Sequence, residues 1–265
     1  MAETNHAKAV LVEKHTRAND TPIARVEKVA LLWLAARMPA WVVPDTLTVI
    51  GLIGSVLIFA SYSLTFFHPG FLWLASFGFI VNWFGDSLDG TLARFRKIER
   101  PRYGFFIDHI IDSISEVMIF VGLGFSPYLR FDLSLLALIS YLLASIYVYL
   151  TNYVNGVFRI SYSGIGPTEF RLVAIFTNTA VFFFGNPQVQ IPFTGMLSTP
   201  LSMTLYDVVV SVVVLVIITL FLYHTINTAM SLSKEDRESY RVKQQQQRAE
   251  RAARRKELRK KRISE

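Results

Sequence analysis

Residues 1–28 and 233–265 are strongly polar, and most apolar residues lie between these segments in long blocks. A helix that crosses a bilayer needs about 20 mostly apolar residues, because the hydrocarbon core is about 30 Å thick. Six blocks approach this length, and the fifth is short because it stops at Gly185-Asn186-Pro187. We therefore predict six membrane-spanning helices, at residues 46–66, 71–93, 105–125, 131–153, 170–185 and 203–229.

The connections between the blocks contain residues that favour turns and loops. They are His68-Pro69-Gly70, Ser126-Pro127, residues 164–167, and a loop with Pro187, Pro192 and Pro200. Blocks and connections together predict an all-α integral membrane protein with six transmembrane helices.

The segment before the first block combines charged and apolar residues. Ala30–Ala36 is apolar but short, and Arg25, Glu27 and Lys28 precede it. This pattern predicts an interfacial helix at residues 22–38 that lies along the membrane surface; a further buried helix of the bundle fits the same residues. The first 20 residues are polar, so no secretory signal peptide is expected there. The predicted domains are residues 1–38, 39–230 and 231–265.

The formal net charge of +7 belongs to the C-terminal segment. Residues 233–265 hold 13 Lys and Arg against 6 Asp and Glu, whereas the other 232 residues hold 14 of each sign. A nucleic-acid surface on the main domain is therefore not indicated. Pairs such as Glu250–Arg254 and Glu257–Lys261 favour a solvated basic helix that continues from the sixth block. The absence of cysteine excludes disulfides and thiolate metal sites.

Lys and Arg are unevenly distributed among the connections. The N-terminal segment, the second and fourth connections and the tail carry nearly all of them, and the first, third and fifth connections hold only Arg130. Cytoplasmic segments of membrane proteins are enriched in Lys and Arg. Both termini are therefore predicted to lie on the cytoplasmic side.

Acidic residues lie at or near the cytoplasmic ends of the second and third blocks. Asp86 and Asp89 are three residues apart, and Asp108, Asp112 and Glu116 follow one another at intervals of four. Each set therefore lies on one face of its helix. A carboxylate that faces lipid costs about 2.5–3.5 kcal/mol, and ten residues join the two helices. We expect antiparallel neighbours whose acidic faces converge on a wet cavity.

The surroundings of these carboxylates favour a metal site. No Lys lies within the spans to pair with them, and the nearby Arg residues lie at helix ends. Carboxylate oxygens suit Mg²⁺, Mn²⁺ or Ca²⁺. Gly90, Ala93 and Gly104 are small enough for a ligand to approach the backbone. Basic residues follow at once, at Arg94, Arg96, Lys97, Arg100 and Arg102. A cation-rimmed metal site suits a phosphorylated substrate, although membrane topology alone also explains part of this rim.

These residues form an ordered motif. It reads Asp86-x-x-Asp89-Gly90-x-x-Ala93-Arg94, then nine residues, then Gly104-x-x-x-Asp108-x-x-x-Asp112. The motif resembles the signature of the CDP-alcohol phosphotransferases, which are membrane enzymes of phospholipid synthesis. Residues 44–51 resemble the Pro-Asn-x-x-Thr-x-x-Gly segment of this family, with Asp45 in place of the usual Asn. The resemblance covers about residues 22–230, so residues 39–230 would form the catalytic domain.

The resemblance implies a reaction and a set of roles. The family cleaves a CDP-linked donor at its pyrophosphate, transfers the distal phosphoryl group to an acceptor hydroxyl and releases CMP. Two Mg²⁺ or Mn²⁺ ions would be held by Asp86, Asp89, Asp108 and Asp112, with Asp112 also acting as the general base. Residues implied in nucleotide binding are Thr48, Asp86, Gly90, Ala93, Arg94 and Gly104. For Arg94, capping of the helix dipole is the alternative.

Three polar residues near the motif have two interpretations each. His109 adjoins Asp108 but points about 100° away from it on an ideal helix, so it is either a second proton carrier or a packed interface residue. Glu116 and Asn82 either bind the acceptor or have a hydrogen-bonded structural role.

The segment Gly164-Ile165-Gly166-Pro167-Thr168-Glu169 resembles a Gly-Pro-x-Glu segment of the choline/ethanolamine branch of the family. Glu169 would then contact the acceptor or assist as a base. Alternatively, the segment only begins a helix, with Thr168 as its N-cap and Glu169 in its first turn.

The substrates remain open at this stage. A phosphorylated acceptor needs cations near the metals, and only Arg159 and Arg171 lie near the fifth span; both are candidate acceptor-binding residues. We favour CDP-diacylglycerol with a small polar alcohol, with CDP-choline or CDP-ethanolamine and diacylglycerol as the alternative. A divalent-cation transporter is a further hypothesis, but it would place its carboxylates near the bilayer midplane and usually show repeats. The resemblance also implies a homodimer.

Overall fold

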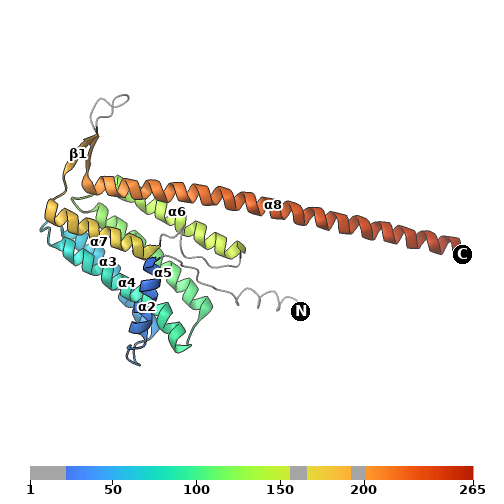
Figure 1. Cartoon of the computed structure of the whole chain (residues 1–265), viewed down its shortest axis with the longest axis horizontal. Coiled ribbons are helices and arrows are strands. Elements are labelled where there is room, and N and C mark those ends of the chain that lie inside the picture. Colours follow the sequence, from blue (N-terminus) through green and yellow to red (C-terminus); the bar gives the residue numbers. More distant parts are fainter. Residues whose placement is uncertain (1–21, 156–165, 192–200, 265) are drawn as a thin grey trace. The chain divides into compact units, whose positions relative to one another are not determined.

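The computed structural model describes residues 22–155, 166–191 and 201–264. Figure 1 shows that helices dominate this part of the chain. They are α2 (Pro22–Ala35), α3 (Pro44–Leu64), α4 (Phe71–Arg96), α5 (Pro101–Gly124), α6 (Phe131–Asn155), α7 (Pro167–Phe184) and α8 (Leu205–Ser264). Two short strands, β1 (Gln188–Ile191) and β2 (Leu201–Thr204), lie between α7 and α8.

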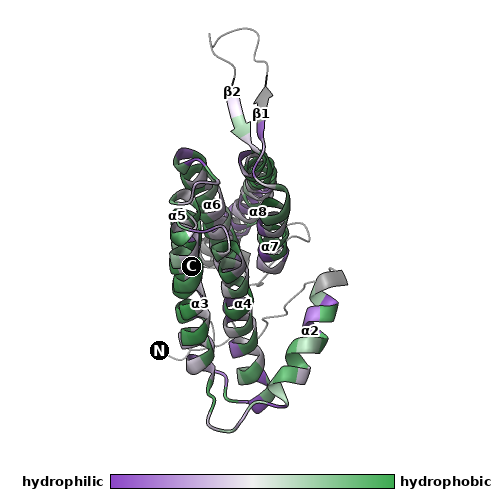
Figure 2. Ribbon diagram, turned by 90° about the vertical axis from the view of Figure 1, so that its left-hand side faces the viewer, coloured by the Kyte–Doolittle hydropathy of each residue, from purple (hydrophilic) through white to green (hydrophobic). Residues whose placement is uncertain are grey.

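Each predicted span coincides with a helix, and among the described residues four helices are long and apolar enough to cross a membrane. These are α3, α4, residues 131–154 of α6 and residues 205–251 of α8. Figure 2 shows how hydrophobic residues cover most of α3 and α5. α5 contains Asp108, Asp112 and Glu116, and α7 has only 18 residues. The chain is thus an α-helical integral membrane protein, and six spans stay a prediction.

The segment before α8 contains a β-hairpin where the sequence had predicted a loop. β1 and β2 pair in antiparallel register, with Gln188 opposite Thr204 and Ile191 opposite Leu201. Both segments, Gln-Val-Gln-Ile and Leu-Ser-Met-Thr, alternate polar and apolar residues with the period of a strand. The prolines of this region had obscured that pattern.

Four of the helices, α2, α3, α5 and α7, begin at a proline. Proline suits the first helical position because its φ angle is preset and its missing N–H would have no intrahelical partner. α4 extends to Arg96 and α5 begins at Pro101, so the connection between them is shorter than the expected ten residues. α4 ends where Lys97 adopts a left-handed conformation with φ of 55°.

α3 packs against both α4 and α5. α6 packs against α5, α7 packs against α4, and α2 also packs against α4. The expectation that α4 and α5 are close neighbours therefore needs refinement: both contact α3, and the acidic pocket lies between the three helices. Arg96 supports the turn between α2 and α3, because its guanidinium donates to the carbonyl oxygens of Val42, Met38 and Pro39.

The backbones of α3 and α4 approach closely at glycines. A Cβ atom added to Gly85 would lie 2.2 Å from the nitrogen of Gly51 and 2.4 Å from the carbonyl oxygen of Leu47. Small residues at such a contact allow two membrane helices to pack backbone to backbone. This contact sets the position of the next turn of α4, which begins with Asp86.

We expect Gly85→Ala to lower the free energy of unfolding by about 1–3 kcal/mol, because the added methyl group forces α3 and α4 apart. Gly104→Ala is the matched control, since a Cβ atom at Gly104 meets nothing within 4 Å. Thermal unfolding of both variants in detergent measures the difference. Equal stability of the two variants would contradict the close packing at Gly85.

The chain divides into two compact units, residues 1–220 and residues 221–265. The second unit is helical as far as Ser264, and nearly all described side chains of residues 231–251 are exposed. In the first unit, α2 has two distinct faces. Leu31 and Ala35 are buried, whereas Val26 and Val29 are exposed.

Candidate active site

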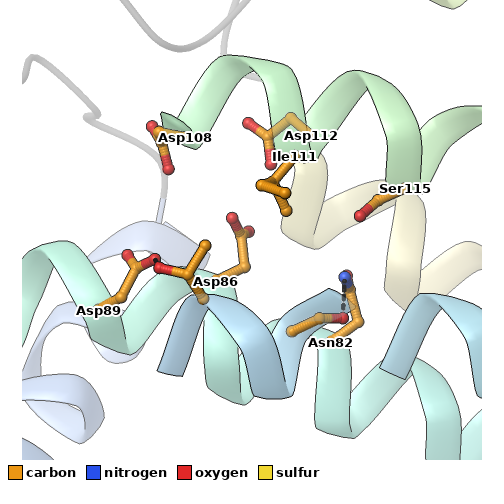
Figure 3. A pocket seen from close by; sticks show the side chains of 9 residues that line it. Asn82, Asp86, Asp89, Asp108, Ile111, Asp112 and Ser115 are labelled. Atoms are coloured by element: carbon orange, nitrogen blue, oxygen red, sulfur yellow. Dashed lines mark hydrogen bonds between the residues drawn. The ribbon is translucent and has the colours of Figure 1, made fainter. Parts of the chain in front are cut away.

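The acidic faces of α4 and α5 converge on a small pocket (Figure 3). Figure 3 shows Asp86 extending from α4 toward Asp112 and Asp108 on α5. α3 closes a third side. The lining residues are Thr48, Gly51, Asn82, Asp86, Asp89, Asp108, Ile111, Asp112 and Ser115. The helical spacing of the carboxylates thus brings them together, as predicted.

Three of the carboxylates are arranged as metal ligands. Asp86, Asp108 and Asp112 each offer a carboxylate oxygen, and these oxygens lie within 4.8 Å of one another. Hard anionic oxygens at such separations suit Mg²⁺ or Mn²⁺. The described side chains of this cluster therefore fit a divalent ion.

Asp89 lies in the same pocket but is held differently. Its Oδ2 accepts a hydrogen bond from Thr48 Oγ1 at 2.6 Å, and its Oδ1 accepts one from the backbone N–H of Gly90. Thr48, which the sequence had assigned to the nucleotide, thus contacts a carboxylate directly. Through Thr48, α3 orients Asp89 beside the three-carboxylate cluster.

Asp86 has a cationic partner that the sequence interpretation had missed. Arg171 Nη2 of α7 donates to Asp86 Oδ2 at 2.6 Å, and its Nε donates to Asn82 Oδ1 at 2.9 Å. The side chains of Arg171 and Asp86 are only 13% and 23% exposed. The sequence had proposed Arg171 as an acceptor-binding residue, and the structure pairs its guanidinium with Asp86. Arg171 is the fifth residue of α7, and packing of α7 on α4 brings it to Asp86.

A second, larger cavity of about 1130 Å³ adjoins the carboxylates. All six residues predicted to bind the nucleotide line it, and so do Asp108 and Asp112. Gly104 presents open space, and a Cβ atom at Gly90 would lie 3.2 Å from Arg94 Nη1. The motif residues therefore share one cavity large enough for an organic ligand.

Comparison with known proteins places the sequence in a family. The model of the CDP-alcohol phosphatidyltransferase family matches residues 41–218, which is more than half of the chain. The chain belongs to the CDP-alcohol phosphatidyltransferase family.

Relatives in this family differ in their named activities. The chain is 27% identical over 176 residues to "Cholinephosphotransferase 1" of Danio rerio, covering 62% of this chain and 45% of the relative. It is 38% identical over 90 residues to "Phosphatidylinositol phosphate synthase" of Cutibacterium acnes, covering 34% and 41%. It is 35% identical over 98 residues to "Archaetidylinositol phosphate synthase" of Pyrococcus horikoshii, covering 37% and 49%. The chain spans less than half the length of these curated relatives.

His109 and Glu116 both line the large cavity. His109 Nδ1 lies 2.7 Å from the carbonyl oxygen of Phe105 and 3.8 Å from Asp108 Oδ2, and its ring packs on Tyr149. Glu116 Oε1 accepts from Ser145 Oγ at 3.3 Å, whereas its buried Oε2 has no hydrogen-bond partner among the described residues. For His109, the roles of proton carrier and packed residue both stay predictions. For Glu116, the roles of acceptor ligand and structural residue both stay predictions, and its Oε2 is available to a ligand.

Glu169 begins the helix α7. Its Oε2 accepts from the backbone N–H of Gly166 at 2.8 Å, and it is not among the residues that line either pocket described above. The prediction that Thr168 is the N-cap is wrong, because Gly166 is the N-cap and Thr168 lies in the first turn of the helix. This geometry matches the helix-start interpretation of the segment. Arg159 lies outside the described residues.

Asp45, which departs from the family pattern, forms an exposed ion pair with Arg100. Asn82, the residue with two interpretations, donates to the carbonyl oxygen of Gly51 and to Ser55 Oγ while accepting from Arg171. Its contacts hold α3, α4 and α7 together.

The sequence interpretation missed several residues that line the large cavity. The missed lining residues are Glu27 of α2 and, on a different helix, Tyr141, Ser145 and Tyr149 of α6. These residues belong to no motif in the sequence. Their spacing of four residues along α6 was the one available signal, and it is also that of an ordinary packed helix face.

Proposed function

We propose that this chain transfers a substituted phosphoryl group from a CDP-linked donor to an acceptor hydroxyl and releases CMP in phospholipid synthesis. The observation that carries this proposal is the meeting of Asp86, Asp108 and Asp112 within 4.8 Å, next to a cavity lined by the family motif. Family membership supports the same reaction. It leaves the hypothesis of a divalent-cation transporter without support.

We propose Mg²⁺ or Mn²⁺, two ions per site, as the cofactor. Asp86, Asp108 and Asp112 would hold them together with Asp89, whose Oδ2 hydrogen-bonds to Thr48. Such ions, when bound, stabilise the charge that develops on the attacking and leaving oxygens of a phosphoryl transfer.

The protein side chains contribute orientation and proton transfer. Asp112 accepts the proton of the attacking hydroxyl, because it lies in the cluster and also lines the large cavity. Gly90, Ala93 and Gly104 leave room for the nucleotide, and Arg94 at the rim of the cavity contacts its phosphates. His109 adjoins Asp108 as a second proton carrier. Asp86 is held in place by Arg171, which fixes one of its two oxygens.

We propose two candidate substrate pairs. CDP-diacylglycerol with a small polar alcohol is one candidate, and CDP-choline or CDP-ethanolamine with diacylglycerol is the other. The engagement of Arg171 with Asp86 and Asn82 leaves it less suited to binding the phosphate of an acceptor. Glu116 Oε2 and the nearby tyrosine rings instead favour a cationic alcohol. The matches to cholinephosphotransferases, which are longer than those to the inositol phosphate synthases, likewise favour CDP-choline or CDP-ethanolamine with diacylglycerol.

A screen of donors and acceptors tests the function. Purified protein with Mg²⁺ or Mn²⁺ receives radiolabelled CDP-diacylglycerol, CDP-choline or CDP-ethanolamine, each with a panel of small alcohols or with diacylglycerol. We expect one donor class to yield CMP together with a labelled phospholipid, and chelation by EDTA to stop the reaction. If no CDP donor yields CMP, the proposed function is wrong.

The arrangement in the membrane belongs to the same proposal. We propose six spans, with both termini and the active site on the cytoplasmic side, and α2 at the membrane surface. Residues 39–230 then form the catalytic domain, flanked by residues 1–38 and by the basic tail 231–265. A homodimer is the proposed assembly, by resemblance to the family.

A further inference from the structure

α2 forms one wall of the large cavity. Glu27, Leu31 and Ala35 follow one another at intervals of four and share its inner face. Leu31 and Ala35 are buried against the residues of α4, and Glu27 and Leu31 line the cavity. The outer face is exposed and carries both apolar and basic residues, with Val29 69% exposed beside Arg25. A carboxylate on the inner face of such a helix needs a specific partner.

Glu27 has three partners, from two other helices. Its Oε1 accepts hydrogen bonds from Trp83 Nε1 at 2.7 Å, from Ser87 Oγ at 3.2 Å and from Thr168 Oγ1 at 3.0 Å. Trp83 and Ser87 belong to α4, and Thr168 belongs to the first turn of α7. One oxygen atom thus joins α2, α4 and α7.

The helix turns that Glu27 joins also carry the ion pair of the active site. Ser87 is adjacent to Asp86 on α4, and Arg171 lies three residues after Thr168 on α7, so it sits on the same side of that helix. Arg171 bridges to Asp86 at 2.6 Å. The N-terminal part of α7 is therefore held at two points, by Thr168 on Glu27 and by Arg171 on Asp86.

We infer that Glu27 is a positioning residue that ties α2 to α4 and α7 and thereby sets Arg171 against Asp86. This inference rests on the proposed function for its kinetic test. All three donors are neutral, so Glu27 acts as a hydrogen-bond acceptor and its negative charge is not required. α2 is then a working part of the active site, rather than a membrane anchor alone.

Substitutions at Glu27 separate the acceptor from the charge. Glu27→Gln keeps an oxygen in the place of Oε1, so kcat for CMP release should stay within about threefold of wild type. Glu27→Ala removes the acceptor and should lower kcat by about 10–100-fold, with the KM for the CDP donor within about threefold. Arg25→Gln, at an exposed position two residues away, is the control and should leave both constants unchanged.

Substitutions at Thr168 test the same contact from α7. Thr168→Val removes the donor and should lower kcat, and Thr168→Ser should restore it because the hydroxyl is kept. In the double variant Glu27→Ala with Thr168→Val, the second change should add less than about twofold, since Glu27→Ala has already removed the contact that Thr168→Val removes. Fully multiplicative effects would show that the two residues act independently and would overturn the inference.

A distance measurement tests the tie without relying on activity. The chain has no cysteine, so spin labels can be attached at Val29 of α2 and Phe176 of α7, which are 69% and 75% exposed. Glu27→Gln should keep the label-to-label distance distribution of the parent protein, and Glu27→Ala should broaden or shift it. An unchanged distribution in Glu27→Ala, or Glu27→Gln as inactive as Glu27→Ala, would overturn the positioning role. If the parent protein releases no CMP, the proposed function fails while the label distances still decide the tie.

Discussion

Asp112→Asn is expected to lower metal-dependent CMP release by at least about 10³-fold. The substitution removes a carboxylate oxygen from the cluster with Asp86 and Asp108, and it removes the proton acceptor proposed for the attacking hydroxyl. Asn has nearly the same shape as Asp, so the fold should be retained. CMP release at saturating Mg²⁺ or Mn²⁺ measures the loss, with the CDP donor that the substrate screen identifies.

Asp132→Asn is the matched control for this prediction. Asp132 is 67% exposed and pairs with Arg130 at the start of α6. It is not among the residues that line the acidic pocket. We expect turnover close to that of wild type. Turnover of Asp112→Asn at the level of this control would remove Asp112 from the reaction and from the proposed metal site.

Arg171→Met is expected to have the second-largest effect, on stability as well as turnover. The pair with Asp86 is mostly buried, at 13% and 23% exposure, and loss of one partner leaves a carboxylate without its cation. Breaking a buried pair lowers the free energy of unfolding by about 2–4 kcal/mol when some solvent access remains. Turnover should fall by about 10²-fold, because Asp86 loses its orientation. Thermal unfolding in detergent and CMP release measure the two effects.

Arg130→Met makes the same chemical change at an exposed ion pair. Arg130 and Asp132 are 50% and 67% exposed, so their pair contributes less than about 1 kcal/mol. Arg171→Lys keeps the charge but cannot bridge Asp86 and Asn82 with a planar fork, and we expect an intermediate result. If Arg171→Met and Arg130→Met lose equal stability, the Arg171–Asp86 pair has no special role.

Much of the candidate site could be read from spacing along single helices. Asp86 and Asp89, and likewise Asp108 and Asp112, lie on one helix face because of the helical period alone. The three-carboxylate cluster and the cavity lined by Gly90 and Gly104 agree with that interpretation. Helix length and apolar content in the same way predicted α-helices at all six blocks.

Contacts between distant helices could not be read in this way. Arg171 looked like a free cation near the fifth span, yet it is bound to Asp86, 85 residues away in the chain. Glu169 had two interpretations in the sequence, and only the structure shows that its Oε2 accepts from the N–H of Gly166 at the start of its own helix. The β-hairpin also escaped notice, because four-residue strands give too short a periodic signal beside several prolines.

The sequence by itself determined the membrane-protein class, the family motif and the helix face on which each carboxylate lies, because these follow from composition and from the period of one helix. The tertiary structure alone decided which carboxylate has a cation, which one is held by Thr48, and that Glu27 joins three helices. Those facts depend on how α2, α3 and α7 pack around α4. The local sequence around a single Arg, Thr or Glu does not specify which residue of another helix its side chain will contact.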